Sequence, residues 1–162
     1  QSSKAGAKAL YALDNLWDGL GALTVVYPEI KYLFGKVTMY PSYSVDCRNM
    51  ILYFLHKHFP DNDNLVTPIK PLEANIDIAA MEKLFVGDCF KEDYKILNKS
   101  IRDYGFNIPP LVNAYMSLSP TMRMFGTAIN DEFGDVEESG IFFAIEEIFE
   151  EKKQRHIGTY NA

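Results

Sequence analysis

The first seven residues of the sequence could bind an anion. They are small or polar and lead directly into a strongly periodic apolar segment: Gln1, Ser2, Ser3, Lys4, Ala5, Gly6 and Ala7. The first turn of a helix carries unpaired N–H groups and the positive end of the helix dipole, and small residues let an anion come close. Lys4 and Lys8 would add positive charge. The junction therefore suggests a phosphate or pyrophosphate site, and a simple polar helix cap is the alternative.

A stretch without basic residues lies between Arg123 and Lys152. Nine acidic residues fall within it: Asp131, Glu132, Asp135, Glu137, Glu138, Glu146, Glu147, Glu150 and Glu151. Carboxylates near Gly134 could receive the ammonium group of an amino-acid substrate, or one could act as a base with a raised pKa. A solvated acidic face is the alternative. Glu138, next to the last predicted strand, is the residue to test first.

Histidine and cysteine spacings do not predict a metal site. Cys47 and Cys89 form no CxxC pattern, which is typical of a reduced, cytoplasmic interior. His56 and His58 are two apart on a predicted helix and therefore point to different sides. His156 lies in a basic segment, where it could face an acidic carrier protein or anionic lipid, or complement a helix end.

Composition narrows the class of protein. The chain has 162 residues, of which 48% are hydrophobic and 23% charged, and this fits one compact domain. The net charge of −6 argues against a nucleic-acid partner, because phosphate neutralisation requires clustered Lys and Arg. The longest apolar runs have five residues, whereas a bilayer span needs about 20. We expect a cytoplasmic protein that is at most peripheral to the inner membrane.

Helical spacing is clear in several segments. Leucines and Trp17 recur three or four apart over residues 5–25, where Gly19 and Gly21 would permit close packing or end the helix. A second helix follows a cap at Ser42 or Ser44 and ends near residue 59. Further helices are predicted over 77–86 and 91–104, from 109 to before 120, and after 152.

The strands complete an α/β pattern. Residues 31–40 are aromatic and β-branched and predict a strand buried largely on both faces. Two late strands are predicted at about 121–129 and 140–146, separated by a turn at Gly134. Residues 61–72 are polar and contain prolines, so they predict a loop. The sequence begins with Gln1, and we expect it to begin inside a fold.

The opening Gln1-x-x-Lys4-x-Gly6-Ala7 resembles the acyl-CoA pyrophosphate loop, Q/R-x-x-G-x-G/A, of the GNAT acyltransferase superfamily, with Lys4 at the usual first glycine. Residues 9–13, 16–21, 32–39 and 107–115 are similar to a bacterial branch of it. That branch contains proteins named as hemolysins and the acyl-carrier-protein-dependent N-acyltransferases of ornithine and glycine lipids. The similarity extends in blocks to about Ile157.

The resemblance implies one GNAT-like domain over 1–162: a mixed β-sheet flanked by helices, with 61–105 as a helical excursion. The strands that precede the loop in such a fold are missing, so the resemblance implies a further N-terminal segment or a second chain, which could supply the general base.

The implied reaction transfers a fatty acyl group to the amine of an amino acid or an amino-acid lipid precursor. The donor is the phosphopantetheine thioester of acyl carrier protein, or acyl-CoA, with no metal. Tyr43 lies where such enzymes often keep a tyrosine that protonates the thiolate, and Tyr53 is its rival. An acetyl-CoA-dependent enzyme acting on a small soluble amine and a catalytically degenerate binding module are the alternatives.

Overall fold

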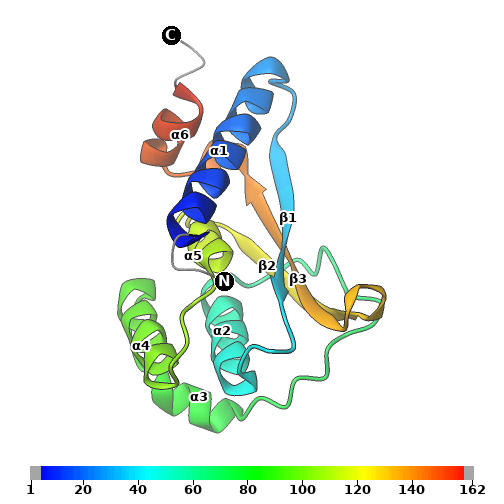
Figure 1. The fold of residues 1–162 in the computed structure, drawn as a ribbon, viewed down its shortest axis with the longest axis vertical. Coiled ribbons are helices and arrows are strands. Elements are labelled where there is room, and N and C mark those ends of the chain that lie inside the picture. The colour runs from blue at the N-terminus through cyan, green and yellow to red at the C-terminus, as the bar shows by residue number, and fades with distance from the viewer. Residues whose placement is uncertain (1–4, 159–162) are drawn as a thin grey trace.

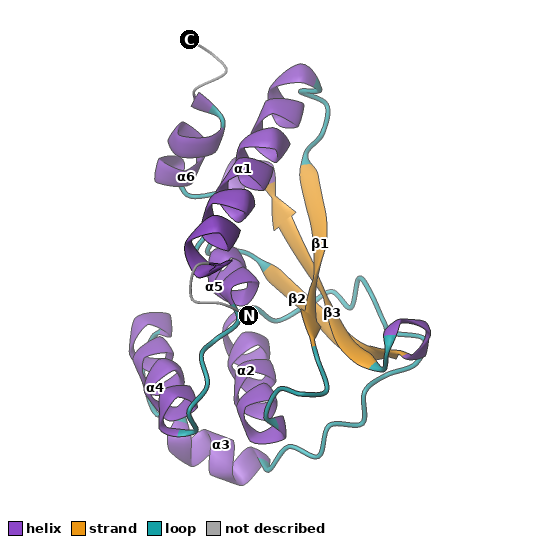
Figure 2. Ribbon diagram, in the orientation of Figure 1, coloured by secondary structure: helices purple, strands orange, loops and turns teal. Residues whose placement is uncertain are grey.

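The structure, a computed structural model, describes the backbone of residues 5–158 and the side chains of residues 14–158. It is a mixed α/β fold, which confirms the predicted class (Figures 1 and 2). The elements in chain order are α1 (Ala5–Val26), β1 (Tyr32–Met39), α2 (Val45–His58), α3 (Ile78–Leu84), α4 (Phe90–Asp103), α5 (Pro110–Met116), β2 (Arg123–Asn130), β3 (Val136–Ala144) and α6 (Glu150–His156). Two short 3-10 helices, Asp131–Phe133 and Ile145–Glu147, flank β3. The predicted elements are therefore present, although β3 begins at Val136 rather than at residue 140.

The three strands form an antiparallel sheet with β3 in the centre, in the order β1-β3-β2. Tyr32 pairs with Ala144 at one end of β1, and Thr38 pairs with Glu138 near the other. The predicted turn between β2 and β3 is present, with Gly134 in the left-handed conformation at a φ of 73°. This topology brings β1 next to a strand that lies about a hundred residues later in the sequence.

The two edges of the sheet differ. The loop after α2 covers the outer edge of β2: the Met124 N–H donates to the Phe59 carbonyl and the Leu72 N–H donates to the Thr127 carbonyl, at 2.9 and 2.8 Å. Among residues 5–158, no segment pairs with the outer edge of β1. One long edge of the sheet therefore retains free backbone groups.

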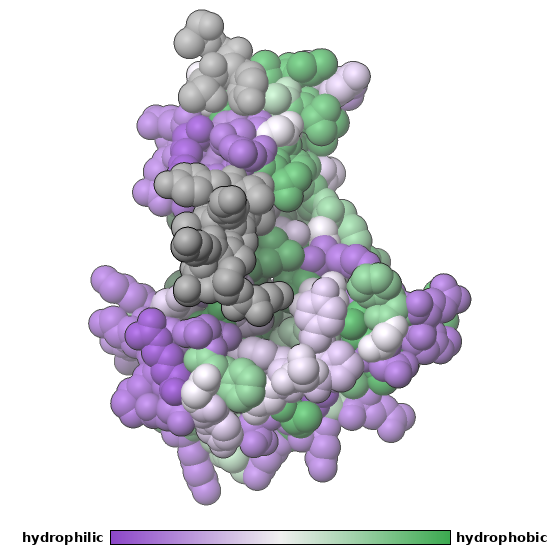
Figure 3. All heavy atoms as spheres, viewed as in Figure 1, coloured by the Kyte–Doolittle hydropathy of each residue, from purple (hydrophilic) through white to green (hydrophobic). Residues whose placement is uncertain are grey.

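The prediction that β1 is buried on both faces is wrong. Val37 and Met39 are buried, whereas Tyr32 and Phe34 are exposed. The helices described here pack on one face of the sheet (Figure 1), so an aromatic strand sequence does not require two covered faces. Figure 3 shows hydrophobic surface along this side of the molecule, over β1 and the last turns of α1, where Leu23 and Val26 are exposed.

Helix α2 provides the centre of the core. Ser44 caps it by accepting a hydrogen bond from the Cys47 N–H, and its inward face buries Ile51, Phe54 and Leu55. Helices α2 and α4 lie side by side below α5, and α1 lies above with α6 beside it (Figure 1). The core therefore continues from the helical lower half to the inner face of the sheet.

Helix α6 packs closely against the second half of α1. A Cβ added to Gly21 would lie 2.0 Å from the carbonyl oxygen of His156, whereas one added to Gly19 meets nothing within 4 Å. The contact is reinforced by an ion pair from Arg155 to Asp14 and by a hydrogen bond between His156 and Asp18. Gly21 thus permits the close packing that the sequence predicts, and neither glycine ends the helix. Within residues 5–158, no helix is both long and apolar enough to cross a membrane.

Candidate functional site

A cavity of about 330 Å³ lies between α1, β1 and α5. Its walls are almost entirely apolar: Leu16, Trp17 and Leu20 from α1, Leu33 from β1, Leu111 from α5 and Phe143 from β3. Leu16 is 68% exposed, so the cavity has an open, hydrophobic side. The volume is within the usual range of small-molecule sites, and the lining suits a ligand that is mostly hydrocarbon.

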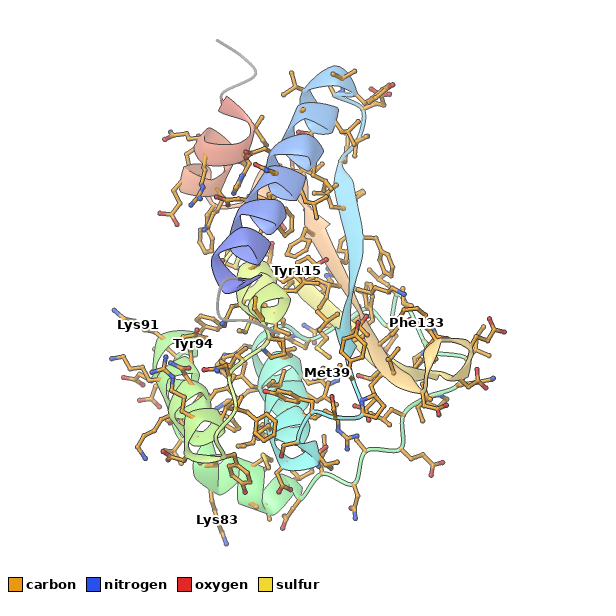
Figure 4. The ribbon with its side chains drawn as sticks, viewed as in Figure 1. Met39, Lys83, Lys91, Tyr94, Tyr115 and Phe133 are labelled. Carbon is orange, nitrogen blue, oxygen red and sulfur yellow. The ribbon has the colours of Figure 1, made fainter. Side chains whose placement is uncertain are left out.

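Tyr115 supplies the cavity with a hydrogen-bond donor. Its ring projects from α5 toward the sheet (Figure 4) and is held between the Phe143 and Trp17 rings, at centroid distances of 5.4 and 5.7 Å. Burial raises the pKa of its hydroxyl, so the group stays protonated at neutral pH. It can therefore donate to an oxygen atom of a bound ligand.

Gly35 on β1 makes room for this hydroxyl. A Cβ at residue 35 would lie 2.5 Å from the Tyr115 oxygen and 3.2 Å from the carbon that bears it. Any side chain at this position would displace the phenol, because its ring is already packed on both sides. Gly35 and Tyr115 thus fit each other across the cavity.

The predicted phosphate-binding junction lies at the start of α1. Gln1, Ser2, Ser3 and Lys4 are outside the described residues, and the helix begins at Ala5, followed by Gly6 and Ala7. Phosphate binding there stays a prediction.

Tyr43 lies after β1, as expected, in the turn before α2. Its hydroxyl donates to the Asn107 carbonyl at 2.9 Å, and its ring packs edge-on against Phe106. Burial, and then the neighbouring Cys47, raise its pKa to about 12. The hydroxyl joins the turn before α2 to the segment before α5, and its catalytic role stays a prediction. The rival Tyr53 stacks on Phe85 in the lower half of the fold.

Glu138 lies in β3, and its carboxylate accepts a hydrogen bond from Lys36 at 2.6 Å and a longer one from Asn130. The Lys36 hydrogen bond, which outweighs partial desolvation, lowers the pKa of Glu138. The raised pKa that a general base would show is therefore not found. The adjacent Glu137 binds Arg48 at the start of α2. These carboxylates join β3 to β1 and to α2. A role for Glu138 in binding the amino-acid substrate stays a prediction.

A charged cluster that the sequence did not suggest is built around Asp93 on α4. This fully buried carboxylate accepts hydrogen bonds from Lys57 at 2.6 Å, from His58 at 2.9 Å and from the Gly87 N–H at 2.8 Å. Burial alone would raise the pKa of Asp93, but these hydrogen bonds together lower it. The cluster fixes α4 against the end of α2.

The remaining histidines have other surroundings. Burial lowers the pKa of His56, and His156 is buried against Asp18 at 2.7 Å, so it is not presented to a carrier protein or a lipid surface. Its role is that of a helix-end contact. Within residues 14–158, no group of three or more His, Cys, Asp or Glu side chains is placed to hold a metal ion.

The sequence did not identify Tyr115 and Gly35 as a pair. Tyr115 was visible only as one member of the apolar face of a helix, and Gly35 as an interruption in a strand. An isolated glycine within a strand often marks a close approach, and this was the available signal. Its partner could not be found, because the two residues are brought together only by the tertiary fold.

Two curated proteins are similar to this chain. Both are named glycine N(alpha)-acyltransferase: one from Phocaeicola vulgatus is 67% identical over 160 residues, and one from Bacteroides thetaiotaomicron is 68% identical over 160 residues. Each alignment covers 99% of this chain, but 49% and 48% of the respective relative. No protein-family model and no solved structure matches the chain. The chain thus spans about half the length of the curated relatives it matches, and both relatives carry the name of an amino-acid N-acyltransferase.

Proposed function

We propose that this chain is part of an N-acyltransferase that moves a fatty acyl group from a thioester donor to the amine of an amino acid, with glycine as the acceptor. The names of the two relatives support the reaction class and the acceptor. The structural observation that carries the proposal is the apolar cavity with its phenol hydroxyl, because such a site suits a hydrocarbon chain with a few oxygen atoms.

In this reaction the free amine attacks the thioester carbonyl carbon. The C–N bond forms and the C–S bond breaks. The amine loses one proton, and the leaving thiolate takes up one proton and departs as a thiol. The protein contributes position and hydrogen bonds to the developing oxyanion.

The donor is the finer part of the proposal. We propose acyl carrier protein as the donor rather than acyl-CoA, with the phosphate of its phosphopantetheine at the start of α1. Membership of the GNAT superfamily and of its lipid-forming branch belongs to the same proposal, as does a cytoplasmic place of action.

A direct assay separates the possibilities. The protein at its natural length is incubated with glycine and either palmitoyl-acyl carrier protein, palmitoyl-CoA or acetyl-CoA, and N-acylglycine is measured by mass spectrometry. Faster product formation from the long-chain carrier thioester supports the proposal. A preference for acetyl-CoA would replace it with a short-chain acetyltransferase, and donor binding without product would indicate a binding module.

A further inference from the structure

A second, smaller apolar cavity lies beside the first. Its volume is about 30 Å³, and it is bounded by Gly21 and Thr24 of α1, by Leu118 and Ile148, and by His156 of α6. Three side chains line both cavities: Trp17, Leu20 and Leu33. Side chains shared in this way form the wall between the two spaces.

Trp17 is the largest part of this wall and is held in place. Its indole packs edge-on against Tyr115, with ring planes at 89°, and it lies partly buried against the core. The small cavity is bounded on its far side by α6, whose His156 carbonyl approaches Gly21. Packed groups therefore hold the indole between the two cavities.

We propose that Trp17 determines the length of acyl chain that this site accepts. The inference rests on the proposed function. The hydrocarbon enters from the open side at Leu16 and ends against the indole. Replacing Trp17 with a small residue removes most of the wall and joins the two cavities, so the lengthened site can bury additional methylenes.

The test compares chain-length profiles. Wild-type, Trp17→Ala and Trp17→Phe proteins of natural length are assayed with saturated acyl-carrier thioesters. Their acyl chains range from about 8 to about 20 carbons, and each step adds about two methylenes. We expect Trp17→Ala to favour a longer chain, with the ratio of kcat/KM for the longer to the original optimal donor increased roughly tenfold, from two further buried methylenes. Trp17→Phe retains an aromatic wall and should shift the profile less.

Phe149→Ala is the matched control. Phe149 lines a different cavity, between α2, α5 and the segment before α6, and its truncation should leave the profile unchanged. A shift caused equally by Phe149→Ala would overturn the inference, because general loosening would then explain it. An unchanged profile in a folded Trp17→Ala protein would overturn it as well.

A binding measurement keeps this test separate from the proposed function. Saturated fatty acids of increasing length compete with a fluorescent fatty-acid probe for the same variants, with no transfer required. If the wild type forms no N-acylglycine, the proposed function fails. The inference stands only if Trp17→Ala selectively improves competition by longer fatty acids, and equal competition curves overturn it. Where Trp17→Ala does not fold, Trp17→Leu replaces it in both assays.

Discussion

Gly19 and Gly21 lie two residues apart in the same helix, yet their replacement by alanine should have opposite effects. In an exposed helix interior, Gly→Ala stabilises by about 0.8–1 kcal/mol. Gly19→Ala should deliver this gain, since its Cβ meets nothing within 4 Å. In Gly21→Ala the same gain is opposed by a Cβ placed 2.0 Å from a backbone oxygen of His156, which cannot rotate away as a side chain can.

Overpacking a tight contact costs about 1–3 kcal/mol, and α6 must move to relieve this one. The two variants should therefore differ by about 1–3 kcal/mol, or roughly 2–4 °C in Tm for each kcal/mol in a domain of this size. Thermal denaturation measures the difference, and hydrogen exchange locates it: Gly21→Ala should lose protection in Glu150–His156 and Gly19→Ala should not. Equal Tm values and unchanged exchange in α6 would refute the packing of α6 on α1.

Three further predictions concern the core and the cavity. Asp93→Asn should lower the free energy of unfolding by about 3–5 kcal/mol at pH 7 in urea denaturation, because the buried cluster loses its negative charge and one of its two acceptor oxygens. Because folding lowers the pKa of Asp93, its contribution to the free energy of unfolding is present above about pH 4 and is lost as pH falls through the folded-state pKa. Asp93→Asn should therefore reduce the loss of stability at acid pH in a plot of unfolding free energy against pH. An unchanged slope on the acid side would contradict this. Arg48→Met should lower the free energy of unfolding by about 1.5–3 kcal/mol, because it leaves the half-buried Glu137 without its partner. Equal urea midpoints for the variant and the wild type would count against that ion pair. Gly35→Ala should lower the free energy of unfolding by about 1–3 kcal/mol in the wild type but by much less in a Tyr115→Phe background. A double-mutant cycle without coupling would exclude the contact between residue 35 and the Tyr115 hydroxyl.

Local signals in the sequence were sufficient for most of the elements. The three- and four-residue spacing around Trp17 gives α1, Ser44 gives the cap of α2, and Gly134 gives the turn before β3. These features depend on residues close together in the chain, and the helical period and turn chemistry express them directly.

Tertiary features were less accessible. The aromatic sequence of β1 gave the strand but not its exposed face, because composition does not record which face a helix covers. The Asp93 cluster joins residues about 35 apart, and the Gly35–Tyr115 fit joins residues 80 apart, so no spacing rule could pair them. The candidate cavity is the clearest case, since it is formed by four separate segments.

The central position of β3 has a consequence for biosynthesis. Within residues 5–158, β1 and β2 do not pair with each other, and both pair with β3, which is the last of these three strands to leave the ribosome. While α2 to α5 are emerging, β1 therefore has no sheet partner from among these strands. The inner edges of β1 and β2 stay unpaired until residues 136–144 emerge. The sheet closes late and over a long stretch of chain, a topology that folds slowly and leaves hydrophobic strands open to chaperones in the interval.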